Sequence, residues 1–237
     1  MFKELFSVII IHITMNTIDK IYIINLKERK DRWTKCLEQL DKYNITNYQR
    51  FDAIKPNFNQ INPIQYSKNN FKLDKKYIIG AFGCKLSHLK IIIEAKQKKY
   101  KRILILEDDF MLTNNFLEKF SQISNNIESH KININMLYLG FSIVREDPYE
   151  DTGIDNLKKL IKGHTTHAYI LSESFYDIVI DKIRQCYCEI DICYVKMQQK
   201  YENIYGIFPC LITQRESYSD ILNRNVNYKK FIELDNK

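Results

Sequence analysis

A run of four apolar residues that ends in three consecutive carboxylates most constrains the fold of this chain. Residues 103–106 have the aliphatic composition of a buried strand, and Glu107, Asp108 and Asp109 follow directly. A cation or polar ligand would relieve the repulsion among these carboxylates at the strand's C-terminal edge, where open α/β sheets bind ligands. Mg²⁺ and Mn²⁺ prefer carboxylate oxygens. A solvated acidic turn is the alternative interpretation.

Strand-like and helix-like segments alternate along the chain. Apolar strands are predicted at 21–26, 48–54, 102–107, 136–140, 166–171 and 204–212. Amphipathic helices are predicted at 29–43, 83–98, 114–123, 172–184 and 192–201. This alternation predicts one α/β domain with a central, mainly parallel sheet flanked by helices. Pro209 interrupts the last strand, which we therefore expect at an edge of the sheet.

The remaining segments are predicted to be irregular. Long loops are expected at 55–76 and 147–159, and a polar tail should lie over the surface from Ser217 onward. We interpret residues 1–17 as an N-terminal extension, 18–222 as the functional domain and 223–237 as a C-terminal tail. The apolar run near the N-terminus is too short to span a bilayer.

Composition and charge narrow the class of protein. The 36 basic residues are dispersed among 29 acidic ones, so the net charge of +7 does not form the basic run of a nucleic-acid-binding arm. A basic face that serves an anionic nucleotide explains the charge equally well, and we predict no nucleic-acid partner. The six cysteines show no CxxC spacing and are expected to be free thiols in a reducing compartment. We expect a cytoplasmic protein, with peripheral membrane association left open, from an organism with an AT-rich genome.

A second polar group follows the first strand. Asn25 ends the strand, and Arg29 and Arg32 lie at the start of the next helix. Backbone N–H groups at such a junction bind phosphate, and arginines pair with pyrophosphate in a bidentate way. A solvated helix start is the alternative.

A third group is Gly80-Ala-Phe-Gly-Cys-Lys-Leu-Ser-His-Leu89. Its glycines, Gly80 and Gly83, permit a tight turn and close backbone approach before a helix that carries Ser87 and His88. The spacing of a P-loop is absent. A purely structural hydrogen-bonding role is the alternative for His88.

Two further groups lie later in the chain. His164 and His167 belong to Gly163-His-Thr-Thr-His-Ala-Tyr169 and could complete a metal shell. Glu189 and Asp191 precede a helix that Asp191 could simply cap. In a parallel sheet, both groups would reach the edge that carries the acidic triplet.

These blocks, in this order and spacing, resemble glycosyltransferase family 25. The resemblance is carried by residues 22–32, 80–89, 103–109 and 167–172 and extends over about 18–222. The family contains bacterial lipooligosaccharide galactosyltransferases and eukaryotic procollagen galactosyltransferases. The resemblance implies a GT-A fold, a nucleotide-sugar donor and inverting transfer, in many members of galactose from UDP-galactose.

The resemblance places the acidic triplet at the position of the family's metal-binding motif, and our hypothesis assigns its roles. Asp109, helped by Glu107 and His167, would bind Mn²⁺ or Mg²⁺ that bridges the two donor phosphates. Asp108 would reach the donor ribose or sugar hydroxyls. Glutamate stands first here, so the triplet departs from a strict Asp-x-Asp motif.

The other blocks would hold the donor and supply the base. Asn25, Arg29 and Arg32 would hold the nucleotide, as would the glycine-histidine block, for which we name Gly83, Ser87 and His88. Inversion needs a base opposite the leaving group, and we assign this role to Asp191, with Glu189 as the runner-up.

The predicted reaction moves a hexose, galactose as the best guess, from a UDP-sugar to a hydroxyl group. Glycan, lipid-linked oligosaccharide and hydroxylated protein remain open as acceptors, and glucose or N-acetylglucosamine as other sugars. A catalytically degenerate binding or scaffold protein is the alternative. The oligomeric state is also open.

Overall fold

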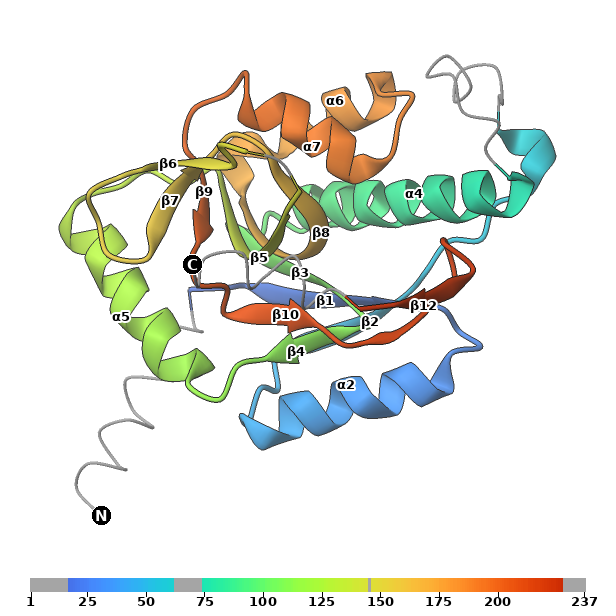
Figure 1. The fold of residues 1–237 in the computed structure, drawn as a ribbon, viewed down its shortest axis with the longest axis horizontal. Coiled ribbons are helices and arrows are strands. Elements are labelled where there is room, and N and C mark those ends of the chain that lie inside the picture. The colour runs from blue at the N-terminus through green and yellow to red at the C-terminus, as the bar shows by residue number, and fades with distance from the viewer. Residues whose placement is uncertain (1–16, 62–73, 145, 228–237) are drawn as a thin grey trace.

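An eight-stranded mixed sheet forms the centre of the molecule (Figure 1). The computed structural model describes residues 17–61, 74–144 and 146–227. The strand order is β2-β1-β3-β8-β5-β9-β7-β6. The strands of this sheet are β1 (Lys20–Asn25), β2 (Tyr48–Asp52), β3 (Arg102–Glu107), β5 (Met136–Ile143), β6 (Tyr149–Asp151), β7 (Leu157–Leu160), β8 (Gly163–Ser172) and β9 (Ile204–Ile207).

Most strands of the sheet run in one direction. β1 is parallel to both β2 and β3, and β5 is parallel to β9. β8 is antiparallel to β3 and β5, and β7 is antiparallel to β9 and β6, so only these two of the eight strands are reversed. The predicted α/β class with a mainly parallel sheet is confirmed.

Helices cover both faces of the sheet (Figure 1). They are α2 (Lys30–Lys42), α4 (Lys75–Gln97), α5 (Phe116–Ser129), α6 (Tyr176–Gln185) and α7 (Ile190–Gln198), with short 3₁₀ turns at η1 (Phe58–Gln60) and η2 (Glu173–Phe175). Alternate side chains of β1 and β3 enter two apolar cores, one shared with α4, α6 and α7 and one with α2 and α5. Burial on both faces explains why these strands are continuously apolar.

Two small strand pairs bring the C-terminal part of the chain against the end of β3. β4 (Phe110–Leu112) pairs with β10 (Ile212–Gln214), and β11 (Ser217–Ser219) forms a hairpin with β12 (Arg224–Val226). The segment predicted as a surface tail is therefore a paired hairpin. The hairpin also crosses the predicted domain boundary at 222.

The prediction of a tight turn before α4 is wrong. The helix begins at Lys75, so Gly80 and Gly83 lie inside it. The absent side chain at Gly83 serves a close approach instead, because a Cβ there would lie 2.3 Å from the carbonyl oxygen of Ile54. This glycine lets α4 pack against the segment that follows β2.

Three other local predictions are corrected. β8 begins at Gly163, three residues before the predicted strand at 166–171, so the whole block Gly163–Tyr169 lies within it. β9 lies between β5 and β7 and is not an edge strand. The region 147–159 is not a loop throughout, because it contains β6 and the start of β7.

Some predictions fall on residues outside the described part of the chain, namely 1–16 and most of the loop 55–76. Among the helices of the described ranges, none is both long and apolar enough to cross a membrane.

Candidate active site

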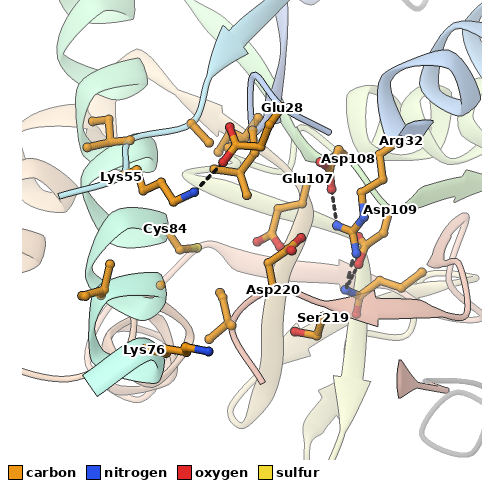
Figure 2. Close-up of a pocket in the computed structure, with 18 residues that line it drawn as sticks. Glu28, Arg32, Lys55, Lys76, Cys84, Glu107, Asp108, Asp109, Ser219 and Asp220 are labelled. Atoms are coloured by element: carbon orange, nitrogen blue, oxygen red, sulfur yellow. Dashed lines mark hydrogen bonds and ion pairs between the residues drawn. The ribbon is translucent and has the colours of Figure 1, made fainter. Parts of the chain in front are cut away.

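The acidic triplet lines a cavity of about 470 Å³ at the carboxyl ends of β1 and β3 (Figure 2). Residues 53–55, one side of α4 and residues 219–221 complete its wall. Glu107 ends β3, and Asp108 and Asp109 form the turn into β4. Parallel strands converge on this edge, which is where open α/β sheets bind ligands.

Both carboxylate oxygens of Asp108 accept hydrogen bonds from protein side chains. Asn25 Nδ2 donates to Oδ2 at 2.6 Å, and Arg32 Nη1 donates to Oδ1 at 2.5 Å. Arg50 Nη2 in turn donates to Asn25 Oδ1 at 2.6 Å. Asn25 and Arg32, which the sequence predicted to hold the nucleotide, instead contact the acidic triplet and orient Asp108.

Arg32 also connects the triplet to the C-terminal hairpin. Its Nη2 donates to Ser217 Oγ at 3.0 Å and to the carbonyl oxygen of Tyr218 at 2.6 Å. Its buried Nε has no hydrogen-bond partner among the described residues and remains a donor that a ligand could use. Arg29 pairs with Asp31 and Asp220, so it fixes the same hairpin from outside the cavity wall.

Glu107 lies between β8 and α4. Thr166 donates its hydroxyl to Glu107 Oε1 at 2.7 Å, and His88 Nε2 lies 3.4 Å from the same oxygen. Burial opposes ionisation of Glu107, but the contacts with His88 and Thr166 prevail and lower its pKa. Because β8 is antiparallel, its first half reaches the carboxyl end of β3, which brings Thr166 there.

Asp109 carries the least compensated charge of the triplet. Gln214 Nε2 donates to its two carboxylate oxygens at 3.2 and 3.4 Å. Burial, and then the charges of Glu107 and Asp108, raise the pKa of Asp109. Gln214 Oε1 is buried without a hydrogen-bond partner among the described residues. An anionic group beside an unsatisfied carbonyl oxygen is an environment that a cation would stabilise.

The three predicted histidines have different surroundings. His88 Nδ1 lies 2.9 Å from the Tyr169 hydroxyl, which lies 3.0 Å from that of Tyr194. His167 has both ring nitrogens engaged, Nδ1 with the Thr165 hydroxyl at 2.9 Å and Nε2 with the carbonyl oxygen of Ile212 at 3.1 Å. We therefore leave His167 out of the metal shell that we propose below. His164 does not line the cavity.

Gly83 and Ser87 do not line the cavity but support a segment of its wall. Ser87 Oγ donates to the carbonyl oxygen of Gly83 at 2.7 Å and accepts the backbone N–H of Ile54 at 2.9 Å. Together with the close approach at Gly83, this bond fixes residues 53–55, which line the cavity.

Asp191 lies outside the cavity lining, in the first turn of α7. Its Oδ1 accepts the backbone N–H of Ile192 at 2.8 Å. Burial, with smaller contributions from the charges of Glu189 and Glu107, raises the pKa of Asp191 to about 6. Asp191 and Glu107 are therefore within electrostatic reach of each other. Glu189 accepts a hydrogen bond from the Tyr77 hydroxyl at 3.0 Å.

Comparison with known proteins identifies the family. The profile of glycosyltransferase family 25 (LPS biosynthesis protein) matches residues 18–194, about three quarters of the chain. The chain belongs to glycosyltransferase family 25. The family and the observed sheet together confirm the predicted GT-A type of α/β fold.

The individual relatives that match this family 25 chain share only about a quarter of the matched residues with it. It is 25% identical over 162 residues to human procollagen galactosyltransferase 2, and the match covers 65% of this chain and 26% of the relative. It is 26% identical over 166 residues to human inactive glycosyltransferase 25 family member 3, covering 65% and 27%. This chain thus matches about a quarter of the length of these relatives. A solved glycosyltransferase involved in glycosylation of the major capsid of PBCV-1 is 12% identical, with a TM-score of 0.47 over 86% of this chain and 95% of that one.

Proposed function

We propose that the family 25 chain is a metal-dependent, inverting hexosyltransferase that uses a UDP-sugar. The carboxyl group of Asp109, the least compensated of the triplet and buried at the wall of a cavity of about 470 Å³, carries this proposal. A cavity of this size fits the pockets that hold small-molecule ligands and cofactors. Galactose is the sugar that we favour, because the related human protein is named a procollagen galactosyltransferase.

The residues at the end of β3 fit a hard divalent cation. Glu107, Asp109 and Gln214 line the cavity; the first two supply carboxylate oxygens and Gln214 supplies the buried, unsatisfied Oε1. Mn²⁺ and Mg²⁺ prefer such oxygen ligands and share them with substrate phosphates. When bound, the ion would act as a Lewis acid that offsets the charge of the departing diphosphate. Asp108, fixed by Asn25 and Arg32, would keep the turn in place.

The protein also supplies cations that suit a nucleotide diphosphate. Lys55 and Lys76 line the cavity together with Arg32 (Figure 2). Lys55 is paired with Glu28 at 2.5 Å in an exposed ion pair, which a phosphate could replace at little cost. We include these two lysines in the donor site, in addition to the residues predicted from the sequence.

Asp191 is the base that we propose. Its carboxylate would take the proton from the acceptor hydroxyl while the oxygen attacks the anomeric carbon opposite the departing UDP. Bond formation to the acceptor and bond breakage to UDP then invert that carbon. A pKa of about 6 leaves Asp191 ionised at neutral pH yet more basic than an ordinary aspartate. Glu189 is the runner-up for this role.

The acceptor is a hydroxyl of a glycan, a lipid-linked oligosaccharide or a hydroxylated protein. A second candidate function is a binding or scaffold role without turnover, which the related human protein named as inactive favours. Glu107, Asp108 and Asp109 are all present in this chain, which argues for turnover.

A panel of nucleotide sugars tests the proposal. UDP-galactose, UDP-glucose, UDP-N-acetylglucosamine and a non-uridine sugar nucleotide are incubated with the protein, with Mn²⁺ or with EDTA, and nucleotide release is measured. We expect release from a UDP-sugar with Mn²⁺, and none with EDTA or in Asp109→Asn. UDP-sugar binding without release from any donor, with acceptors supplied, would favour the scaffold role.

A further inference from the structure

A thiol, an imidazole and a carboxylate meet beside the cavity. Cys84 and His88 lie four residues apart on α4, so they share one face of the helix, and that face meets Glu107 at the end of β3. One ligand atom from each of the three lies within 4.8 Å of the others. Cys84 and Glu107 line the cavity, so an ion from solvent could reach the cluster.

His88 is the member of this cluster whose geometry points to a ligand. Its side chain is fully buried, and Nε2 makes no hydrogen bond with the described residues. The nearest carboxylate oxygen, Glu107 Oε1, is 3.4 Å away without hydrogen-bond geometry. A buried ring nitrogen that faces a carboxylate oxygen without a hydrogen bond is under-satisfied, and a cation bound between the two would satisfy both.

The groups around the cluster have the arrangement that orients metal ligands. His88 Nδ1 is within hydrogen-bond distance of the Tyr169 hydroxyl, which continues to Tyr194. Thr166 fixes Glu107 through Oε1. Ligating histidines and carboxylates are commonly held by such outer hydrogen bonds, which set the ring orientation and the tautomer.

From this geometry we propose that Cys84, His88 and Glu107 bind a transition-metal cation of the Zn²⁺ or Co²⁺ class. A thiolate and an imidazole suit these ions rather than Mg²⁺, and three protein ligands leave a fourth tetrahedral position open toward the cavity. The three donor atoms would have to move only slightly closer together to form metal–ligand bonds of about 2.0–2.3 Å. The site goes beyond the proposed transferase function, although both use Glu107.

Co²⁺ without any nucleotide is the probe, because a cobalt thiolate has a charge-transfer absorption band. We expect the absorbance of this band to rise with added Co²⁺ and to saturate in the wild type. In Cys84→Ser the absorbance at saturation should be lower, because the thiolate of Cys84 is missing. His88→Gln should weaken Co²⁺ binding by at least about 10-fold, since it removes a ligand rather than an outer partner. Zn²⁺ should displace the band.

Other thiols need a control, because Cys186 Sγ and Cys188 Sγ lie 2.8 Å apart and could also bind Co²⁺. Their contribution remains in Cys84→Ser, so the difference from the wild type isolates Cys84. Cys210→Ser is the matched control, since Cys210 is a buried thiol that donates to the Phe141 carbonyl away from the cluster. It should leave the band unchanged.

The site is refuted if the Co²⁺ spectrum and affinity are the same in the wild type, Cys84→Ser and His88→Gln. His88 and Glu107 would then be an ion pair without a metal. Should both variants misfold, the anomalous zinc signal in crystals of the wild type soaked in Zn²⁺ decides: a peak between the three side chains supports the site, and its absence refutes it. None of these readouts requires sugar transfer, so failure of the transferase proposal would leave them intact.

Discussion

At the scale of single residues, Arg32 is the side chain on which the acidic triplet depends most. Its pair with Asp108 is nearly buried, with 11% and 10% of the two side chains exposed. Arg32→Met should lower the free energy of unfolding by about 3 kcal/mol, because removing one partner leaves a buried charge without compensation. Urea denaturation followed by circular dichroism measures the change.

Arg29→Met is the matched control for that substitution. Arg29 makes ion pairs of its own, but with carboxylates that are 61% and 36% exposed. Pairs of this kind contribute about 0–1 kcal/mol. Equal destabilisation by the two variants would contradict the role that we give to Arg32.

Asp191 determines the predicted pH dependence. Burial raises the pKa of Asp191 to about 6, and a base must be ionised to accept a proton. The transfer rate should therefore fall as the pH drops through about 6 and level off above it. Asp191→Asn should reduce transfer by about 10²- to 10⁴-fold and leave UDP-sugar affinity unchanged.

Glu189→Gln separates Asp191 from the runner-up. We expect this variant to retain transfer and the same pH profile, measured with saturating Mn²⁺ and donor. Loss of transfer in Glu189→Gln, with native rates in Asp191→Asn, would move the role of base to Glu189.

At the scale of elements, α4 forms one wall of the cavity through a close contact. Gly83→Ala should lower the free energy of unfolding by about 1–3 kcal/mol, because the new Cβ would lie 2.3 Å from the backbone oxygen of Ile54. Gly80→Ala in the same helix should cost less, since its Cβ would come no closer than 3.1 Å to Ile221. Thermal unfolding compares the two variants, and equal melting temperatures would contradict the account.

Elements with strong apolar spacing were predictable from the sequence. The predicted strand at 21–26 and helix at 29–43 match β1 and α2 to within a residue at each end, because burial of both faces of β1 and of one stripe of α2 dominates their folding. The start of α4 was not predictable. Gly80 and Gly83 are typical of turns, and here they serve helix packing, which depends on a distant segment.

The candidate site was predictable only where it is continuous in sequence. The acidic triplet and Asn25 follow buried strands, so their meeting at one sheet edge could be expected. Thr166 and Gln214 are separated from their carboxylate partners by 59 and 105 residues, and a hydroxyl or an amide carries no spacing signal. Only the tertiary structure brings them there.

At the scale of the whole molecule, the reversed strand β8 decides which residues reach the site. Residues 163–167 begin β8, so a parallel strand would place them at the opposite edge from the triplet, contrary to the expectation from the sequence. Because β8 runs antiparallel beside β3, its first half reaches the acidic edge. The C-terminal hairpin then closes the cavity through Arg32 and Arg29. The order and direction of the strands therefore bring the residues of the proposed active site together from segments that are far apart in the sequence.

The central claim is that the acidic triplet binds a sugar nucleotide through a divalent cation. Calorimetric titration of UDP-galactose, with and without Mn²⁺, tests it most directly in the wild type, Asp109→Asn and the control Asp52→Asn. Asp52 is an exposed carboxylate at the end of β2, on the same edge of the sheet. We predict that Mn²⁺ strengthens binding at least about 10-fold, or 1.4 kcal/mol, in the wild type and in Asp52→Asn, but not in Asp109→Asn. Equal affinity with and without Mn²⁺ in the wild type, or an undiminished Mn²⁺ effect in Asp109→Asn, would contradict the account.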